Sequence, residues 1–318
     1  MRITLRQLEY FIAAAEAGSI ALASARIRVS PPSISTAISQ LETELGAQLF
    51  LRRHAQGLSL TPAGQKLLVE AKAVIGQAQN LYTAASEATG QVSGALSLGC
   101  LLTFASMVLP EVSQSFQAAY PGVTIRPTVS DHQTLLARLE RAELDIALSY
   151  DLLVPEGFEF TPLAGLPPHV QVAETDPLAA LTAISLAELA DQPFILLDLP
   201  LSRDYFLALF AAAAVTPNII AQIQHLDVIR TMVASRYGYT LANVRPRNKA
   251  ALDGRRLVSL RLAGDHRPMR LGLLSAGQRV PTRLVQAFEA HCRQLISSSY
   301  VPGMDAPVLM PRRRDVTN

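Results

Sequence analysis

Residues 28–46 read RVSPPSISTAISQLETELG, and this stretch decides the fold of the N-terminal part of the chain. Ser30 is a good N-cap residue, and Pro31 suits the first helical position, where its missing N–H costs nothing. Apolar residues then recur every three or four positions, which predicts a helix over residues 31–45. These apolar residues are Ile34, Ile38, Leu41 and Leu45. The opposite face carries small polar groups without bulk or acid, namely Ser33, Ser35, Thr36, Ser39 and Gln40.

Two further helical patterns precede this helix. Residues 5–15 place apolar side chains at spacings of three and four, which predicts a helix with one apolar face. Gly18 ends it, and Ser19 can cap a short, Ala-rich helix over residues 20–27. A short helix, a tight turn and a second helix with a polar outer face are typical of a helix-turn-helix. An ordinary three-helix bundle with a solvated outer face is the alternative.

Two features favour DNA binding over the plain bundle. The polar face of the 31–45 helix has no Asp or Glu before Glu42, as a surface that approaches phosphates should. Residues 49–61 read LFLRRHAQGLSLT, which predicts two short strands around a Gly-containing turn, the arrangement called a wing. We expect Arg52, Arg53 and Thr61 to contact the phosphate backbone there.

Residues 63–88 predict one long helix, about 39 Å at ~1.5 Å per residue. A helix this long with a continuous apolar seam usually needs a partner helix, so we favour pairing between two copies. Packing of the seam on its own domain is the alternative. The seam consists of Leu67, Leu68, Ala71, Val74, Ile75, Ala78, Leu81, Tyr82 and Ala85.

Composition excludes several classes of protein. With 49% hydrophobic and 17% charged residues, the chain is neither disordered nor collagen-like. Its apolar runs fall short of a membrane span, and charge near Met1 replaces the apolar core of a signal peptide, so we expect a cytoplasmic protein without a membrane partner. Two cysteines make neither a disulfide framework nor a cysteine zinc site, and no HExxH or CxxC occurs, so no cofactor is expected. A net charge of +2 does not by itself indicate nucleic-acid binding.

From about Gly94, short strand-like runs alternate with helical patterns, which predicts βαβ units and a mainly parallel sheet. Residues 90–94, GQVSG, mark the boundary. The tail 300–318 has no periodic apolar face and is expected to be disordered. The strand-like runs are Ala95–Gly99, Val123–Ile125, Leu144–Leu148, Phe194–Leu197, Tyr239–Ala242 and Met269–Leu274.

The second half of the sequence contains few features of an enzyme. It contains no GxSxG, P-loop or GxGxxG motif, and Cys100 has no His beside it in sequence, so a small buried thiol is the favoured interpretation. Asp145, Asp151 and Asp198 could suggest a carboxylate pair, but solvated acids at strand ends are commoner. A small-molecule-binding or catalytic α/β protein with an incidental helical N-domain remains the alternative to a DNA-binding protein.

Ligands of open parallel sheets sit beyond the carboxyl ends of the strands. The polar and aromatic residues at those ends suit a small organic molecule with an apolar body and one polar or carboxylate end. Arg203 would hold a carboxylate bidentately, but Asp131, Asp151, Asp198 and Asp204 would repel it unless they pair or point outward, so a neutral or amine-bearing ligand is almost as well supported. The candidate ligand-binding residues are Cys100, Thr103, Phe104, Ser130, His132, Tyr150, Asp198, Pro200, Ser202, Arg203, His225 and Asn243.

Residues 5–64 resemble the winged helix-turn-helix of LysR-type transcriptional regulators. Two residues depart from that pattern, because Pro31 stands where the family usually has Gln and Gln56 stands where Arg is common. Pro31 removes one base-reading side chain of the usual set, and DNA binding itself remains the expectation. The matching residues are Leu5-Arg-Gln-Leu8-x-x-Phe11, Gly18-Ser19, Ala23-x-Ala25, Val29-Ser30-x-Pro32-x-Ile34-Ser35, Ile38-x-x-Leu41-Glu42-x-x-Leu45-Gly46-x-x-Leu49-Phe50, Arg53 and Leu60-Thr61-x-Ala63-Gly64.

The resemblance implies an N-terminal all-α winged helix-turn-helix with a long linker helix, followed by a two-lobed α/β effector domain like the periplasmic binding proteins. Two chain crossings between the lobes would form a hinge that suits ligand-driven closure. The implied divisions are the DNA-binding domain 1–62, the linker and dimerisation helix 63–90, and the effector domain 91–299, with lobe one at 92–162 and 267–299 and lobe two at 163–266.

The implied function is sequence-specific DNA-binding transcription regulation under the control of a small-molecule effector bound between the lobes, not enzymatic catalysis. The expected partners are a promoter inverted repeat of double-stranded DNA, a small organic effector, and further copies of the chain. The copies would pair through the linker helix into a homodimer, and dimers would pair into a homotetramer. Hydroxyls at Thr103, Ser130 and Ser202 stand where members of the family commonly contact effectors.

Overall fold

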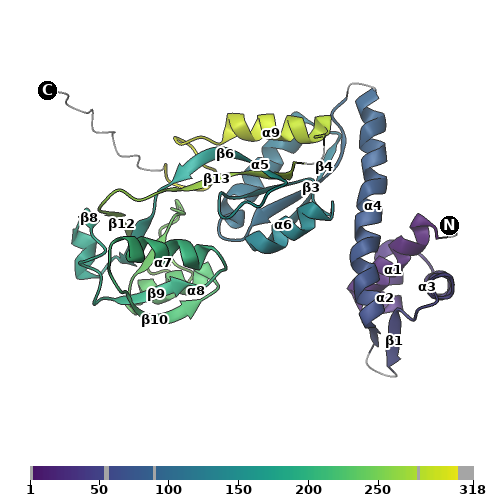
Figure 1. Cartoon of the computed structure of the whole chain (residues 1–318), viewed down its shortest axis with the longest axis horizontal. Coiled ribbons are helices and arrows are strands. Elements are labelled where there is room, and N and C mark those ends of the chain that lie inside the picture. The colour runs from purple at the N-terminus through teal and green to yellow at the C-terminus, as the bar shows by residue number, and fades with distance from the viewer. Residues whose placement is uncertain (1–2, 54–56, 89–90, 278–279, 307–318) are drawn as a thin grey trace. The chain divides into compact units, whose positions relative to one another are not determined.

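The computed structural model describes residues 3–53, 57–88, 91–277 and 280–306, with the backbone alone at 52, 53, 57 and 79–88. The chain forms two compact units, and the boundary between them falls at Gln91 and Val92 (Figure 1). In the described ranges no single helix is long and apolar enough to cross a membrane, although the bent pair Leu5–Ala17 and Ile20–Ile27 meets the length and composition test together.

The N-terminal unit contains the predicted three helices, wing and long helix. Thr4 begins the first helix with a reciprocal hydrogen-bond pair to Gln7, and Ser30 caps the third by accepting from the Ser33 amide. Ser19 precedes the second helix as predicted, but its side chain makes no capping bond. The elements are α1 Leu5–Ala17, α2 Ile20–Ile27, α3 Pro31–Leu45, β1 Phe50–Arg53, β2 Gly57–Leu60 and α4 Pro62–Ala88.

The start of α4 packs on its own unit. Ala71 is fully enclosed, and Leu67, Leu68 and Ile75 pack against the core around Phe11. Part of the predicted seam therefore belongs to the intramolecular core, which was the alternative interpretation. Val74 is 42% exposed on the helix surface. The side chains of Leu81, Tyr82 and Ala85 lie outside the described residues.

A glycine lets α4 approach the wing. A Cβ atom on Gly64 would lie 2.2 Å from the carbonyl oxygen of Leu49, well inside the contact distance of real side chains. Any other residue at this position would push the helix away from β1, so the packing of α4 against the wing requires glycine here.

The larger unit consists of two lobes, and lobe one is built on a five-stranded sheet. The sheet order is β4-β3-β5-β13-β6, in which β4, β3 and β5 are parallel and β13 runs antiparallel to both of its neighbours, β5 and β6. Helices α5 and α9 lie together on one side of this sheet, and α6 lies on the other. The elements are β3 Gly94–Leu101, α5 Ala105–Ala119, β4 Val123–Ser130, α6 His132–Glu140, β5 Ile146–Tyr150, β6 Phe158–Leu166, β13 Met269–Ala276 and α9 Arg283–Leu295.

Lobe two has a sheet of order β11-β7-β12-β8 and a parallel pair β10-β9, linked through main-chain bonds between Tyr239 and the strand at Pro193 and Ile195. The central strand β7 runs antiparallel to both of its neighbours, whereas the pairs β10-β9 and β12-β8 are parallel, so the prediction of a mainly parallel sheet fails at β7 and holds for the other pairs of this lobe. The elements are β7 His169–Ala173, the 3₁₀ helix Pro177–Ala180, β8 Ala183–Ile184, β9 Pro193–Leu197, α7 Ser202–Ala212, β10 Asn218–Ile223, α8 Leu226–Ala234, β11 Thr240–Ala242 and β12 Leu257–Leu262.

The lobe boundaries differ slightly from those expected. Strand β6 stays paired with β13 up to the Leu166–Met269 pair, so the chain leaves lobe one after residue 166 rather than 162 and rejoins it at 269 rather than 267. The ladder continues because apolar Ala164, Leu166 and Met269 are buried in the core of lobe one.

The C-terminal segment is packed as far as it is described. Val301 and Met304 are buried in the core of lobe one, and the amides of Arg247 and Asp305 donate to the carbonyls of Gly303 and Arg245. The prediction of disorder from residue 300 is therefore wrong for residues 300–306, because two apolar side chains and main-chain bonds hold this segment. Residues 307–318 lie outside the described residues.

Candidate DNA interface and ligand cavity

Helix α3 presents a polar face made of Ser33, Ser35, Thr36, Ser39 and Gln40, hereafter the α3 face. Four of these side chains are exposed, and that of Ser35 is partly exposed. The inner side of the helix is held by Ile34, Ile38 and Leu41, which are enclosed in the core of the unit. The core thus fixes which side of α3 faces outward.

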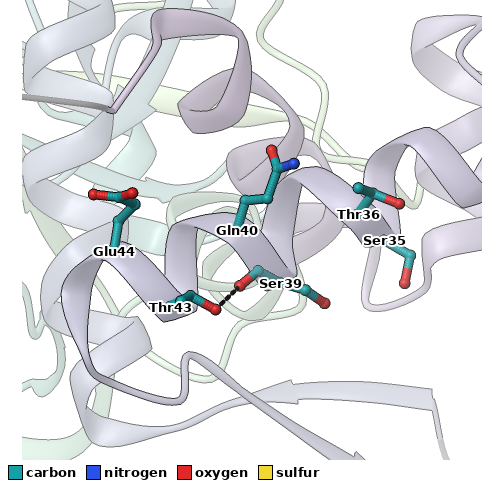
Figure 2. A pocket seen from close by; sticks show the side chains of 6 residues that line it. All are labelled: Ser35, Thr36, Ser39, Gln40, Thr43 and Glu44. Atoms are coloured by element: carbon teal, nitrogen blue, oxygen red, sulfur yellow. Dashed lines mark hydrogen bonds between the residues drawn. The ribbon is translucent and has the colours of Figure 1, made fainter.

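The α3 face borders an open hollow of about 370 Å³. Thr43 and Glu44 extend its lining by a further turn, and the hydroxyl of Thr43 donates to the carbonyl oxygen of Ser39 (Figure 2). All the labelled side chains project from the same helix, so the hollow is an open strip along α3. Glu44 places an acid at the C-terminal end of this strip.

Gln40 is held in place by helix α1. The side-chain nitrogen Nε2 of Gln7 donates to Gln40 Oε1 at 3.2 Å. Gln7 is itself fixed by the capping bonds to Thr4. Since its oxygen is occupied, the amide nitrogen of Gln40 is the group left to donate to a base or phosphate.

Glu42, the first acid on α3, serves the wing. Its Oε1 accepts from the amides of Leu49 and Phe50 at 2.7 and 3.2 Å, which joins the end of α3 to the start of β1. This carboxylate is therefore committed to main-chain amides. Its occurrence in the sequence does not place a free negative charge on the α3 face.

The predicted phosphate contact at Thr61 is contradicted. Thr61 is only 8% exposed, its hydroxyl donates to the Gln48 carbonyl at 2.7 Å, and the Gly64 amide donates to it at 2.9 Å. These bonds cap the start of α4, because a hydroxyl before a helix satisfies an amide of the first turn. The hydroxyl proton is used within the fold, so Thr61 has a structural role.

Arg52 and Arg53 lie on β1, opposite Leu58 and Gly57 of β2. This pairing places both residues in the predicted wing. Their side chains lie outside the described residues, so a contact between these arginines and phosphate stays a prediction.

A small, partly open cavity lies between the two lobes, hereafter the interlobe cavity. Its volume is about 20 Å³, which accommodates about one water molecule. The structure brings four of the predicted ligand residues together around it: Thr103, Tyr150, Ser202 and Asn243. The remaining lining, which the sequence did not single out, is apolar and consists of Leu197, Phe206, Leu226, Leu241, Ala242, Val244 and Met269.

Hydrogen bonds in and around the cavity connect the lobes to the hinge. Thr103 and Tyr150 hydroxyls lie 3.5 Å apart, and the Asn243 amide donates to the Leu166 carbonyl at 2.8 Å and to the Tyr205 hydroxyl at 3.3 Å. Asn243 Oδ1 is buried without a hydrogen-bond partner in the described part of the chain. A buried acceptor of this kind is costly unless a water or ligand donates to it.

The other predicted ligand residues do not line the cavity. Phe104 packs edge-on against Tyr150, with 5.1 Å between ring centroids, and so contacts a residue that lines the cavity. His132 is enclosed and bonded to the Ser149 hydroxyl at 2.8 Å, with burial lowering the pKa of its imidazole. Cys100 is fully buried, and Ser130 is bonded to Asp131 at 3.4 Å. Pro200 and His225 are exposed outside the cavity lining.

Arg203 does not reach the cavity either. Its guanidinium pairs with Asp198 at 3.0 Å and with Asp204 at 3.1 Å. Hydrogen bonds from these two carboxylates, Asp204 first, raise the pKa of the Arg203 guanidinium. The predicted carboxylate clamp at Arg203 is therefore contradicted, because neighbouring acids already occupy this arginine and it lies outside the lining.

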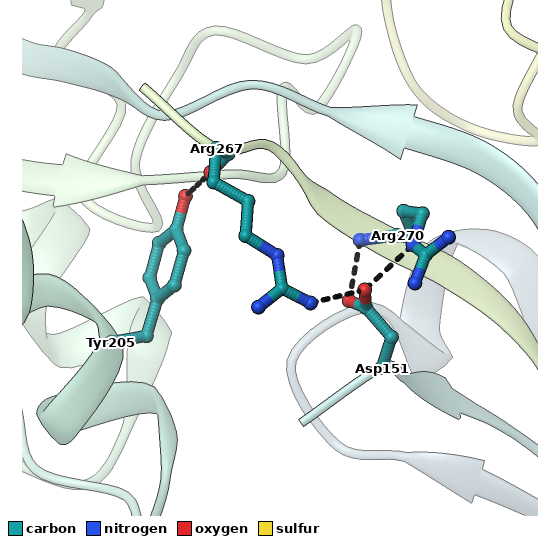
Figure 3. Close-up of polar contacts among 4 residues, drawn as sticks. All are labelled: Asp151, Tyr205, Arg267 and Arg270. Carbon is teal, nitrogen blue, oxygen red and sulfur yellow. Dashed lines mark hydrogen bonds and ion pairs between the residues drawn. The ribbon is translucent and has the colours of Figure 1, made fainter. Parts of the chain in front are cut away.

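Asp151 secures the point where the chain returns to lobe one (Figure 3). Its carboxylate accepts from Arg267 at 2.8 Å and from the side chain and amide of Arg270 at 2.7 and 2.9 Å. Tyr205 of lobe two donates to the Arg267 carbonyl at 2.7 Å. Burial opposes ionisation of Asp151, but the hydrogen bonds and charges of Arg270 and Arg267 outweigh it and lower the pKa of this carboxyl. The expectation of a solvated acid is thus wrong for Asp151.

Neither cysteine is placed for thiolate chemistry. Cys100 and Cys292 are free and buried, and burial raises the pKa of both thiols. Within the described ranges, no group of three or more His, Cys, Asp or Glu side chains could hold a metal ion.

Two family models match the chain. The model for the bacterial regulatory helix-turn-helix protein, lysR family, matches residues 5–65, and the model for the LysR substrate binding domain matches residues 89–297.

Individual relatives agree with these matches. HinK, a LysR family transcriptional regulator from Pseudomonas aeruginosa, is 32% identical with a TM-score of 0.65, and the alignment covers 93% of this chain and 99% of that one. The transcriptional activator IlvY of Salmonella typhimurium is 28% identical over 89% of this chain and 97% of its own length. The hydrogen peroxide-inducible genes activator of Dickeya chrysanthemi is 28% identical over 75% and 78%.

Proposed function

The chain belongs to the LysR-type transcriptional regulators, which join a DNA-binding domain to an effector-binding domain, and we propose that it reads promoter DNA with the α3 face and responds to a small neutral molecule held between its lobes. The observation that carries the first half of this proposal is the acid-free, exposed α3 face on a helix whose inner side is locked into a core.

The α3 face favours DNA recognition by many weak contacts. Serine and threonine hydroxyls and one amide can each bond to base edges or phosphates, but none forms the bidentate contact that arginine makes with guanine. Sequence preference is then spread over several positions. The wing residues Arg52 and Arg53 would add phosphate contacts that do not depend on sequence.

Fluorescence anisotropy with the gene's own upstream region, against a scrambled fragment of equal length, tests DNA binding. We expect the upstream fragment to bind at least about 1,000-fold more tightly at physiological salt, the lower end of the usual range of specific over non-specific binding. Equal affinity for both fragments at every salt concentration would leave only the alternative, an α/β ligand-binding or catalytic protein with an incidental helical domain.

The lining of the interlobe cavity supports a neutral effector. It contains hydroxyls and one carboxamide but no ionisable acid or base apart from the Tyr150 phenol, whose pKa is raised by burial. A carboxylate placed here would lose its hydration without gaining a cation, which is costly. An apolar molecule that donates a hydrogen bond to Asn243 would satisfy the orphaned acceptor.

The cavity has to widen for such a molecule, since it now holds about one water. The crossings at residues 167–168 and 263–268 can act as the hinge, as in other two-lobed ligand-binding domains. Effector binding would then favour a more open arrangement of the lobes, the reverse of the ligand-driven closure expected from the sequence, because the cavity is too small for a ligand as it stands. DNA affinity would change to the extent that the two arrangements bind DNA differently.

Thermal shifts with matched neutral and acidic small molecules test the effector proposal. An amide or alcohol should raise the melting temperature by mass action, and the corresponding acid should not. Asn243→Asp should weaken the binding of the neutral ligand, because the substitution places a negative charge in the cavity. A ligand that proves to be an anion and binds undiminished to Arg203→Ala would overturn the neutral assignment.

Assembly through α4 completes the proposal. Val74 is exposed on α4 and available for a partner helix, and a dimer would place two α3 helices on an inverted repeat. Pairing of dimers would give a homotetramer. A regulator of chromosomal promoters acts in the cytoplasm, where we place it.

We assign no catalytic role. Several relatives carry the name hydrogen peroxide-inducible genes activator, but a thiol response to peroxide needs an accessible thiolate. Cys100 and Cys292 are buried thiols with raised pKa values, so peroxide sensing through cysteine has no support in this chain.

A further inference from the structure

A second hollow opens on lobe two, away from the interlobe cavity, hereafter the basic hollow. Its volume is about 260 Å³. Four of its lining residues are cationic and two are acidic, so positive charge is in excess. The lining consists of Gln171, Glu174, Arg230, Arg245, Pro246, Lys249, Arg256, Leu257, Val258, Ser259 and Asp305.

Arg230 is the most enclosed of these cations, at 6% exposed. Its guanidinium donates to the carbonyls of Asn248 and Ala250 at 3.0 and 3.1 Å, and burial lowers its pKa. No carboxylate of the described chain forms an ion pair with it. The charge of Asp227 favours the ionised guanidinium but does not outweigh burial. A buried charge that is only partly compensated is unfavourable, so an added anion would be stabilising here.

Arg245 and Lys249 add two further charges. Neither forms an ion pair with a described carboxylate, and burial lowers the pKa of Arg245 although Asp305 opposes that effect. Arg256 is different, because it is exposed and already pairs with Glu174 at 3.2 Å. Three of the four cations are therefore available to a ligand.

Gln171 contributes a buried polar group to the lining. It is 2% exposed, and its Oε1 has no hydrogen-bond partner in the described part of the chain. Its amide nitrogen lies 3.3 Å from Nε2 of His169, whose pKa burial lowers to about 3, so that imidazole is neutral. Turning the amide over would let oxygen accept from His169 and leave the NH₂ group as a donor for a ligand.

The walls of the basic hollow come from both sides of the hinge. Asp305 belongs to the C-terminal segment, whose Val301 and Met304 are buried in lobe one, whereas Gln171 and Arg230 belong to lobe two. A cavity of about 10 Å³ beside it is lined by Asn243, Arg245 and Asp305, among others. This small cavity shares Arg245 and Asp305 with the basic hollow and Asn243 with the interlobe cavity, so it links the two sites.

We propose that the basic hollow is a regulatory site for a small polyanion that carries two or more phosphate or carboxylate groups. The excess of cations calls for more than one negative charge. The volume lies just below the usual range for small-molecule sites, ~300–1,000 Å³, which favours a compact anion over a nucleotide. By bridging lobe two and the C-terminal segment, the anion would stiffen the hinge.

Isothermal titration of the full chain with inorganic pyrophosphate and with citrate, at constant ionic strength, tests the proposal. We expect one site per chain with a dissociation constant on the order of 0.1–1 mM for at least one of the two probes. The tighter probe identifies phosphate or carboxylate as the preferred group. No saturable binding of either probe would overturn the proposal.

Three variants locate the binding. Arg245→Gln and the exposed Lys249→Gln should each weaken it about ten-fold, which corresponds to about 1.4 kcal/mol. Asp305→Asn should tighten it, because it removes the acid that competes for Arg245. Arg255→Gln is the matched control, since Arg255 carries the same charge on the same loop but pairs with Asp253 outside the hollow.

Equal weakening by Arg255→Gln and Arg245→Gln, or no tightening by Asp305→Asn, would show diffuse attraction to a basic surface and overturn the site. The DNA-binding domain can also attract polyanions, but loss of binding in Arg245→Gln with unchanged DNA affinity separates the two. The inference does not depend on the identity of the interlobe effector.

Discussion

At the scale of single residues, Thr61 separates a structural role from a DNA contact. Its hydroxyl lies between the Gln48 carbonyl and the Gly64 amide, where it caps α4. In the sequence Thr61 stands beside the wing, and this position suggested a contact between its hydroxyl and the DNA phosphate backbone. A hydroxyl before a helix serves either purpose, and only its burial distinguishes them.

Thr61→Ala should destabilise the start of α4 by about 1 kcal/mol, the usual cost of a lost N-cap. Hydrogen exchange of the Gly64 amide should become about five-fold faster, since ~1 kcal/mol is roughly a factor of five. Thr61→Ser, which keeps the hydroxyl, is the control. The salt dependence of DNA binding should not change. A shallower dependence of DNA affinity on salt in Thr61→Ala would show that Thr61 contacts a DNA phosphate after all.

Asp151 predicts a pH dependence. Its pKa is lowered in the folded chain, so its contribution to stability is complete above the unfolded value of ~3.9 and is lost as the pH falls through the folded value. Asp151→Asn should cost about 1–2 kcal/mol at pH 7, since its arginine partners are more than half exposed and can be rehydrated. Urea denaturation at pH 7 and at pH 3 should show the difference between variant and wild type shrinking at the lower pH. A constant difference would mean that the carboxyl charge is not what stabilises the hinge.

At the scale of elements, α3 was predictable because its signals are local. Ser30, Pro31 and Gly46 mark its ends, and the core residues repeat at helical spacing, so the structure confirms a helix over Pro31–Leu45. Strands β7 and β12 had no such markers. Their antiparallel pairing joins segments far apart in sequence, for example Val170 with Leu260, and no local pattern encodes that register.

Substitutions on α3 and the wing should separate base reading from phosphate contact. Thr36→Ala and Gln40→Ala should change the preferred DNA sequence, and Gln7→Ala should weaken the same preference by releasing Gln40. Arg53→Ala should weaken all sequences alike and flatten the salt slope by about one unit. Anisotropy against a panel of single-base variants of the upstream site measures both. If Arg53→Ala altered only the sequence preference, these roles would be misassigned.

Helix α4 divides its residues between the core and the surface. Val74→Glu should leave the N-terminal unit folded but shift the protein from dimer or tetramer towards monomer and weaken DNA binding at least ten-fold, because a charge would enter the apolar pairing seam. Light scattering at micromolar concentration measures the assembly, and Lys66→Glu on the exposed side of the same helix is the control. A wild-type protein that is monomeric would refute the pairing.

At the scale of the whole molecule, the sequence located the ligand region but not its lining. Thr103 and Asn243 were expected from their places at strand ends, and both line the interlobe cavity. Arg203 was expected to bind a ligand carboxylate because of its positive charge. The acids that neutralise it, Asp198 and Asp204, are its neighbours in space as well as in sequence. Leu226 and Met269 both contribute apolar lining, but they come together only after the chain has crossed between the lobes twice. No sequence pattern shows this proximity.

Selection of DNA fragments from a random library by the full-length protein tests the central claim most directly, because it asks for sequence reading and pairing together. We predict enrichment of an inverted repeat whose half-sites lie one or more helical turns apart, roughly 10.5 base pairs per turn, and loss of that repeat in Val74→Glu. Recovery of fragments without any shared sequence, or of single half-sites with the wild-type protein, would contradict the account.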